Sequence, residues 1–169
     1  MSLRFGIVTV SDRSARGERE DLSGPALVEQ VRKSGGTIAM MTVVPDDLDR
    51  IRDLLIRWSD NGMLDVLLTT GGTGFSPRDV TPEATSAVIE RPAPGLAEAM
   101  RIESLKVTPH AMLSRATAGI RGRTIIVNLP GSPRGAVENL IVILEVLPHA
   151  VELLQESPQA ERGHQAERD

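Results

Sequence analysis

The alternation of short apolar runs with longer segments of helical periodicity most strongly constrains how this chain can fold. Four runs have the β-branched composition and the length of buried strands, at residues 4–10, 37–44, 65–70 and 123–129. Apolar residues at three- and four-residue spacing predict helices at residues 25–34, 46–61, 95–107 and 132 to about 154. This alternation predicts a three-layer α/β fold, in which a mostly parallel sheet carries helices on both faces.

Three further segments are less regular. Residues 11–24 are polar and predict a loop, and residues 111–122 predict a short strand and a turn. Thr81 precedes Pro82 and Glu83. This order predicts a helix start with a threonine cap, a proline in the first turn and an early acidic residue.

The length of 169 residues fits one domain. We expect residues 1–155 to form it, and we expect residues 156–169, which are polar and charged, to be a disordered tail. No apolar run approaches the ~18 residues of a membrane span, and the N-terminal residues do not resemble a secretory signal. We therefore expect a cytoplasmic protein that does not enter the membrane.

Composition argues against several classes of function. The net charge is −4, and the chain has two phenylalanines, one tryptophan and no tyrosine. It thus lacks both the basic surface and the stacking platforms that are typical of nucleic-acid binding. The absence of cysteine excludes disulfides and thiolate sites, and three scattered histidines do not have the spacing of a zinc site.

Polar and glycine-rich residues follow each of the four predicted strands. They are Ser11, Asp12 and Arg13 after the first strand, Asp46 after the second, Thr70, Gly71, Gly72, Thr73, Gly74 and Asp79 after the third, and Asn128, Pro130, Gly131 and Ser132 around the end of the last. Parallel strands end at one edge of a sheet, and ligands of such sheets bind outside that edge. The convergence of these residues therefore predicts a ligand site there.

The glycine-rich loop at residues 71–74 has two interpretations. Glycines allow positive φ and a close approach of the backbone to a ligand, and successive N–H groups can bind phosphate. A tight turn at the end of a strand is the alternative, and the loop alone does not favour either. No Lys-Ser or Lys-Thr follows, so the loop is not a Walker loop, and it lacks GxGxxG spacing.

Asp46 and Asp79 are the candidate metal ligands, because Mg²⁺ prefers carboxylate, water and phosphate oxygens. Taken alone, Asp46 is better explained as a helix cap. A turn or a salt bridge with Arg78 is the alternative for Asp79. Asp12 has a similar turn interpretation, and Asp47 is expected to be a solvated acid in the first helical turn.

Arg13, Arg78 and Arg115 have the forked donors that suit phosphate, although solvated surface arginines are more common. Ser132 precedes Pro133 at the start of the last helix. A helix N-terminus binds anions, so Ser132 is either a phosphate ligand or simply the cap.

Residues 69–74 (Thr-Thr-Gly-Gly-Thr-Gly) and 78–85 (Arg-Asp-Val-Thr-Pro-Glu-Ala-Thr) closely resemble the signature of the MogA/MoaB family of molybdenum-cofactor proteins. Further segments match in the same order, at residues 8–13, 44–46, 113–115, 118–122 and 127–133. The resemblance extends over residues 4–154, which is nearly the whole predicted domain.

The resemblance implies a molybdopterin-binding fold and a homo-oligomer, either a trimer or a hexamer built from trimers. Active members are molybdopterin adenylyltransferases, which use Mg²⁺ and ATP to place AMP on the terminal phosphate of molybdopterin and release pyrophosphate. Their two functional aspartates fall here at Asp46 and Asp79, which would organise Mg²⁺ or the nucleotide. The other residues at the strand ends, together with Ser114 and Arg115, are expected to bind the substrates, with residues 11–13 beside the pterin.

Three alternatives stay open at this point. The chain can be a molybdopterin-binding relative without catalytic activity, or a scaffold domain that acts with other proteins of molybdenum-cofactor biosynthesis. It can also be a hydrolase of nucleotide derivatives with a similar glycine loop, although residues 78–85 fit the molybdopterin family better.

Overall fold

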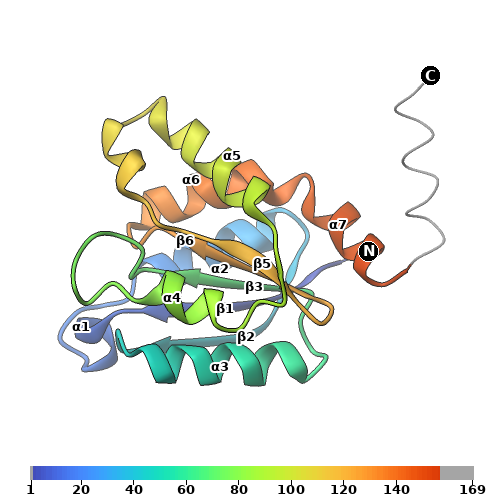
Figure 1. Ribbon diagram of the computed structural model, residues 1–169, viewed down its shortest axis with the longest axis horizontal. Coiled ribbons are helices and arrows are strands. Elements are labelled where there is room, and N and C mark those ends of the chain that lie inside the picture. The colour runs from blue at the N-terminus through green and yellow to red at the C-terminus, as the bar shows by residue number, and fades with distance from the viewer. Residues whose placement is uncertain (1, 157–169) are drawn as a thin grey trace.

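A six-stranded sheet in the order β2-β1-β3-β6-β5-β4 forms the centre of the computed structural model, which describes residues 2–156 (Figure 1). The strands are β1 (Arg4–Val10), β2 (Thr37–Val44), β3 (Val66–Thr70), β4 (Arg91–Pro92), β5 (Ala118–Arg121) and β6 (Thr124–Leu129). Strand β1 pairs in parallel with β2 and β3, and β3 pairs in parallel with β6, whereas β4 and β5 run antiparallel. The predicted mostly parallel sheet is thus confirmed, and the expected tail beyond Glu156 lies outside the described residues.

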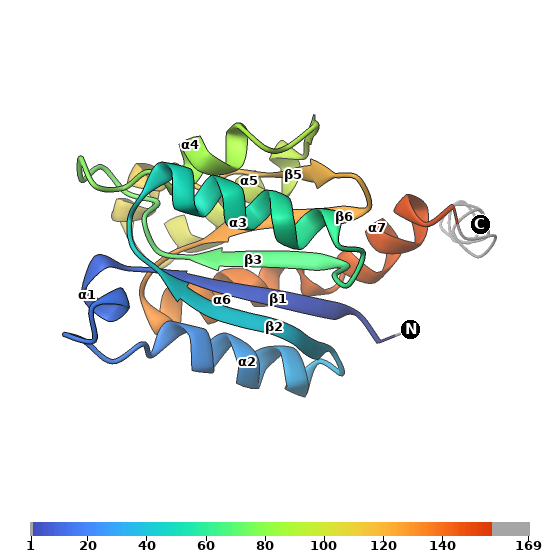
Figure 2. The same ribbon diagram turned by 90° about the horizontal axis from the view of Figure 1, so that it is seen from below.

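Helices cover both faces of this sheet (Figure 2). They are α1 (Asp12–Ala15), α2 (Ser23–Lys33), α3 (Leu48–Asp60), α4 (Thr81–Ser86), α5 (Pro94–Leu105), the 3-10 helix η1 (Pro109–Leu113), α6 (Pro133–Leu144) and α7 (Leu147–Leu154). Helices α2, α5, α6 and α7 share one hydrophobic cluster with the sheet, and α3 and α4 share another. The three-layer prediction is therefore confirmed.

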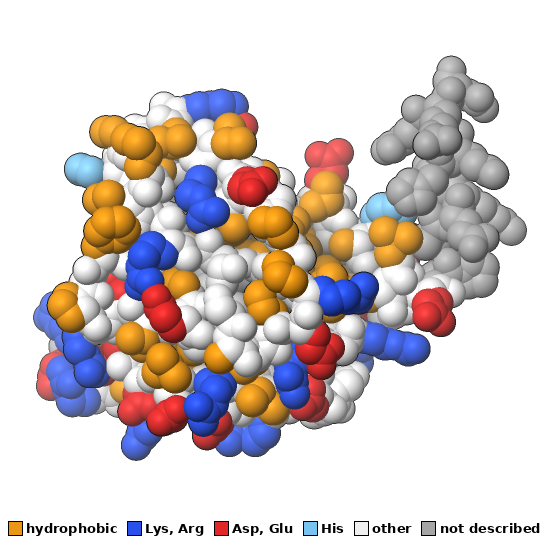
Figure 3. Space-filling view, viewed as in Figure 1, with side chains coloured by type: hydrophobic (Ala, Val, Ile, Leu, Met, Phe, Trp, Pro, Cys, Tyr) orange, Lys and Arg blue, Asp and Glu red, His pale blue; other side chains and the backbone are white. Residues whose placement is uncertain are grey.

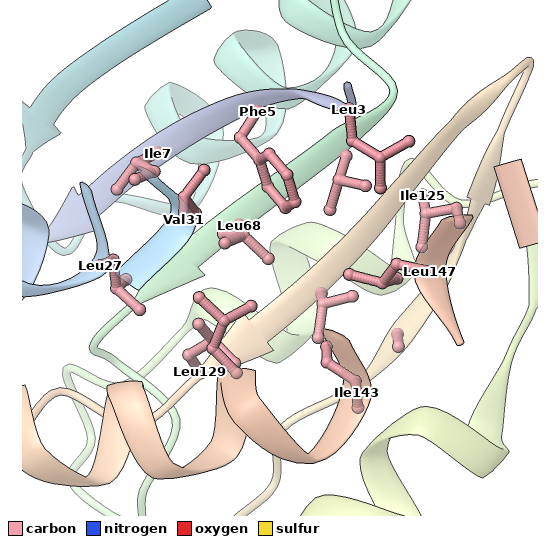
Figure 4. Close-up of a cluster of buried hydrophobic side chains, with 14 of the residues drawn as sticks. Leu3, Phe5, Ile7, Leu27, Val31, Leu68, Ile125, Leu129, Ile143 and Leu147 are labelled. Carbon is pink, nitrogen blue, oxygen red and sulfur yellow. The ribbon is translucent and has the colours of Figure 1, made fainter. Parts of the chain in front are cut away.

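The two hydrophobic clusters take alternate residues of the same strands. In β3, Leu68 packs with the α2 and α6 side and its neighbour Leu67 packs with the α3 side. This is the two-residue alternation of a strand that is buried on both faces. The larger cluster joins Phe5 of β1 to Val31 of α2 and to Ile143 of α6 (Figure 4). Both clusters hold the strands rigidly behind the loops at their carboxyl ends.

The prediction of one helix from residue 132 to about 154 is wrong, because the chain forms α6 and α7 with a break between them. Pro148 explains the break. In a continuous helix its ring would clash with the carbonyl of Leu144, the last residue of α6. The chain therefore restarts at Leu147, which places the proline in the first turn of α7.

Two local predictions near the strand ends also need correction. The segment predicted as a loop at residues 11–24 contains α1, and Ser11 caps it by accepting a hydrogen bond from the N–H of Ser14 (3.2 Å). Thr81 is not the cap of α4, because Val80 occupies that position. The Thr81 hydroxyl instead donates to the carbonyl oxygen of Gly71 (2.9 Å) and ties the helix start to the glycine loop.

Exposed apolar side chains gather around α5 and η1, at the upper left of the space-filling view (Figure 3). They include Ile102, Leu105, Val107, Met112 and Leu113. Among residues 2–156, no helix has the length and hydropathy that a membrane crossing would need.

Candidate active site

A cavity of about 370 Å³ opens at the carboxyl ends of the parallel strands. From β1 the chain continues to β2 on one side of the sheet, and from β3 it continues to β6 on the other side. The strand order therefore reverses between β1 and β3. Ligands of open α/β sheets bind at such a reversal. The wall includes these residues from the predicted set: Ser11, Asp46, Thr70, Gly71, Gly72, Asp79, Gly131 and Ser132.

Asp46 and Asp12 join the loops after β2 and β1 by reciprocal hydrogen bonds. The N–H of Asp12 donates to Oδ2 of Asp46 (2.8 Å), and the N–H of Asp46 donates to Oδ1 of Asp12 (3.0 Å). The expectation that Asp46 caps the following helix is wrong. Asp47 is the cap of α3, since its carboxylate accepts from the N–H of Arg50 (2.9 Å). Asp46 is thus free of the capping role, and it lines the cavity.

The carboxylates of Asp46 and Asp12 have different electrostatic environments. Burial raises the pKa of the Asp46 carboxyl above its ordinary value, and the nearby charges of Asp12 and Asp79 raise it further. A hydrogen-bonded ion pair with Arg78, in which Nη2 lies 2.7 Å from Oδ2, lowers the pKa of Asp12. Asp12 is therefore paired with a cation, whereas Asp46 forms no ion pair of its own among residues 2–156 and feels Arg78 only at a distance.

Asp79 lies in an exposed loop that Arg115 holds in place. Nε of Arg115 donates to the carbonyl oxygen of Gly74 (2.7 Å), Nη2 donates to the carbonyl oxygen of Asp79 (2.7 Å), and Nη1 pairs with Glu83. The Asp79 carboxylate accepts from the N–H of Ser76 (2.9 Å), which matches the turn interpretation. The predicted alternative of a salt bridge with Arg78 is wrong, because Arg78 pairs with Asp12.

The backbone of the glycine loop requires glycine at two positions. Gly71 has φ +105°, and a Cβ there would lie 2.3 Å from the carbonyl oxygen of Val10. Gly72 has φ +66°, and a Cβ there would approach Oδ1 of Asp46 to 3.1 Å. The N–H of Gly71 donates to the carbonyl oxygen of Leu129 (3.2 Å), so it stabilises the turn itself. The N–H groups of Gly72, Gly131 and Ser132 make no hydrogen bond with residues 2–156.

Ser132 is the cap of α6, as one of its two predicted interpretations requires. Its hydroxyl accepts from the N–H of Gly135 (3.1 Å) and so caps α6, and the residue also lines the cavity. The N-terminus of α6 therefore faces the cavity, and a helix N-terminus attracts anions.

Other predicted residues lie outside this cavity. Asn128 is fully buried, and its amide donates to the hydroxyls of Thr69 (2.9 Å) and Thr85 (2.8 Å), so it joins β6 to β3 and α4. Arg13 is exposed on α1, and Arg115 acts on the loop as described above. The remaining four line a second cavity of about 290 Å³ on the other side of the loops: Thr73, Gly74, Pro130 and Ser114. Ser132 lines both cavities.

The sequence reasoning missed one wall of the main cavity. That wall comes from the segment between α1 and α2 together with the first residue of α2, and it includes Arg19, Glu20, Asp21, Leu22 and Ser23. The segment follows a predicted parallel strand, which was the only available signal, but its charges resemble those of any solvated loop.

The donor set fits Mg²⁺ bound together with a phosphorylated substrate. Two carboxylates, Asp46 and Asp79, line the cavity from different loops. No group of three or more acidic, histidine or cysteine side chains in residues 2–156 forms a self-sufficient metal site. Mg²⁺ commonly uses one or two carboxylates and takes its other ligands from water and phosphate.

The comparisons with known proteins agree with this geometry. A family model described as a probable molybdopterin binding domain matches residues 6–149. The chain belongs to this molybdopterin-binding family. The molybdopterin adenylyltransferase of Helicobacter pylori is 40% identical, over 90% of this chain and 88% of that protein. The Drosophila melanogaster molybdenum cofactor synthesis protein cinnamon is 42% identical over 98% of this chain, which spans only 28% of that protein.

Solved structures of the family share the fold. The molybdopterin biosynthesis enzyme MoaB from Thermus thermophilus superposes with a TM-score of 0.86 and is 50% identical. The match covers 92% of this chain and 98% of that structure. The expected fold of the molybdopterin-binding family is thereby confirmed.

Proposed function

We propose that this chain is a molybdopterin adenylyltransferase, which transfers AMP from Mg²⁺-ATP to the phosphate of molybdopterin and releases pyrophosphate. The observation that carries the proposal is the approach of Asp46 and Asp79, from separate loops, to one cavity beside the glycine loop. Relatives with the adenylyltransferase name match over most of their length and most of this chain. When bound between these carboxylates and the nucleotide, Mg²⁺ would neutralise phosphate charge.

The chain's own groups position two anionic substrates for an in-line displacement. An oxygen of the molybdopterin phosphate attacks the α-phosphorus of ATP, and the bond to the bridging oxygen breaks as pyrophosphate leaves with the electron pair. Gly72, Gly131 and Ser132 line this space, their N–H groups have no partners among residues 2–156, and in this proposal they serve as phosphate donors. The roles of the remaining predicted ligands follow from their positions. Ser11 and Thr70 shape the wall, and Asp12, Arg115 and Asn128 support it.

An adenylylation assay on Asp79→Ala tests the proposal. We expect turnover to fall by about 100-fold or more, since the variant loses a charge that acts on the transferred group. Asp53→Ala is the matched control, because Asp53 pairs with Arg52 on the exposed surface of α3. Wild-type turnover in Asp79→Ala would overturn the role of Asp79. If the unaltered chain binds molybdopterin but releases no pyrophosphate from ATP, it is a silent member of the family.

The cellular setting and assembly complete the proposal. We place the enzyme in the cytoplasm as a homo-oligomer, either a trimer or a hexamer built from trimers, without nucleic-acid or membrane partners. Light scattering coupled to size-exclusion chromatography measures the number of subunits directly. A monomer at micromolar concentration would contradict the assembly and leave the catalytic assignment unchanged.

A further inference from the structure

The main cavity has an acidic wall although its proposed substrates are anions. Four acidic residues line it: Glu20, Asp21, Asp46 and Asp79. Arg19 is the only lysine or arginine among the described residues that line it. A cavity of one charge sign repels ligands of the same sign. Besides the proposed Mg²⁺ and the backbone N–H groups, a cationic side chain on this wall would offset that repulsion.

The loop that carries Arg19 is anchored on both sides of the residue. Before it, the N–H of Glu18 donates to the carbonyl oxygen of Arg13 (2.9 Å). After it, the carboxylate of Asp21 accepts from the hydroxyl of Thr9 (2.8 Å) and from the N–H of Gly24 (3.0 Å). These contacts tie the loop to β1 and to the start of α2. The position of Arg19 at the cavity thus follows from the fixed backbone around it.

The guanidinium group of Arg19 differs from those of the other arginines near the site. Arg78 is committed to Asp12, and Arg115 is committed to Glu83 and two carbonyl oxygens. Arg19 makes no hydrogen bond or ion pair with any of residues 2–156. Its five donors are available to a ligand, and their forked geometry matches a phosphate group.

We propose that Arg19 binds the phosphate of molybdopterin and sets the affinity for that substrate. The inference rests on the proposed adenylyltransferase function. In the proposed function Asp46 and Asp79 would hold Mg²⁺ for the phosphates of ATP, and a guanidinium group would serve the attacking phosphate. A guanidinium group at that phosphate offsets its repulsion from the triphosphate and from the acidic wall.

The test is Arg19→Gln, with Arg16→Gln as the matched control. Arg16 lies on the same loop but pairs with Glu18 on the exposed surface, away from the cavity wall. We expect Arg19→Gln to raise KM for molybdopterin about tenfold, with kcat and KM for ATP nearly unchanged, because it removes a charged hydrogen bond that forms on binding. Isothermal titration of molybdopterin should show the same loss of affinity. Arg19→Lys should recover part of it, since it restores the charge without the fork.

Three outcomes would overturn the role of Arg19: an unchanged KM for molybdopterin, a rise confined to KM for ATP, or an equal effect of Arg16→Gln. The titration separates this result from failure of the proposed function. If the wild-type chain binds molybdopterin without adenylylating it, the function fails, while the affinity difference between wild type and Arg19→Gln still decides the role of Arg19.

Discussion

Asp46 and Asp79 reach the same cavity from loops that are held in different ways. Asp46 lies two residues beyond β2 and exchanges hydrogen bonds with Asp12, which lies two residues beyond the neighbouring strand β1. Asp79 lies nine residues beyond β3, and its loop is held by Arg115, which precedes the antiparallel strand β5. One carboxylate thus depends on two adjacent parallel strands, and the other depends on a distant segment of the chain.

The antiparallel side of the sheet therefore takes part in building the site. Arg115 does not line the main cavity, yet it holds the carbonyl oxygens of Gly74 and Asp79. The family resemblance implies that Arg115 binds the substrates, whereas its contacts favour a role in positioning the loop. This role can be tested against that of Asp12.

The largest effect should come from Arg115→Gln. We expect kcat to fall about 100-fold, because a small displacement of a reacting group has an effect of this size. The matched control is Arg121→Gln. Arg121 also holds a carboxylate, Asp60, and a carbonyl oxygen, that of Val88, but it does so away from the cavity.

Both variants should lose about 1 kcal/mol in free energy of unfolding, measured in urea, because each loses a partly exposed ion pair and its hydrogen bonds. Only Arg115→Gln should lose turnover. Equal turnover in the two variants would show that Asp79 does not need the arginine.

A smaller effect is expected from Asp12→Asn. The substitution keeps an oxygen for the N–H of Asp46 but removes the charge that pairs with Arg78. We expect about a tenfold loss of kcat, the size found when a residue that supports a metal ligand is altered. Glu18→Gln, which removes the Arg16–Glu18 ion pair from the same segment, should retain wild-type turnover. A loss as large as that of Arg115→Gln would mean that the two loops are equally dependent on their supports.

The smallest effect concerns stability and pH. The raised pKa of Asp46 means that the folded state keeps a proton that the unfolded state releases. The free energy of unfolding therefore falls as the pH rises above about 4, the ordinary pKa of aspartate. At pH values above the pKa of Asp46 in the folded state the loss is complete and stays constant.

Asp46→Asn should thus be slightly more stable than wild type near neutral pH, with a gain in free energy of unfolding below about 1 kcal/mol. At low pH the two proteins should be equally stable. For Asp12 the pKa is lowered, so Asp12→Asn should have the opposite sign at neutral pH. Thermal unfolding between acid and neutral pH, without Mg²⁺, measures both. A stabilising Asp12→Asn would contradict the ion pair.

Much of the fold could be predicted because local sequence patterns determine most of its strands and helices. Strands β1 and β2 occupy the predicted residues, since both are apolar runs of β-branched character bounded by polar or proline residues. Periodicity did not reveal the break at Glu145 and Val146, because apolar residues continue through it and only Pro148 signals the interruption. The two-residue strand β4 has no pattern of its own, as its pairing with β5 defines it.

The site was predictable as a location and less so as a set of contacts. Strand ends place Asp46, Asp79 and the glycine loop at one edge, and that follows from the parallel sheet. The pairing of Arg78 with the Asp12 carboxylate and of Arg115 with the Glu83 carboxylate joins residues far apart in the sequence, and no local pattern encodes it. The predicted cap of α3 was Asp46, but the cap is the next residue, Asp47. The two aspartates are chemically equivalent, so only the backbone conformation distinguishes them.

The glycine loop and the end of β6 form a partition between two cavities, since Ser132 faces both and a Cβ on Gly131 would lie 3.3 Å from Cα of Gly71. A ligand that shifts this partition from one side must alter the space on the other. By thermodynamic reciprocity, each occupant would then change the affinity of its neighbour by the same factor. Close packing across Gly131 and Gly71 would thus couple the occupancy of the two cavities through the backbone as well as through side chains.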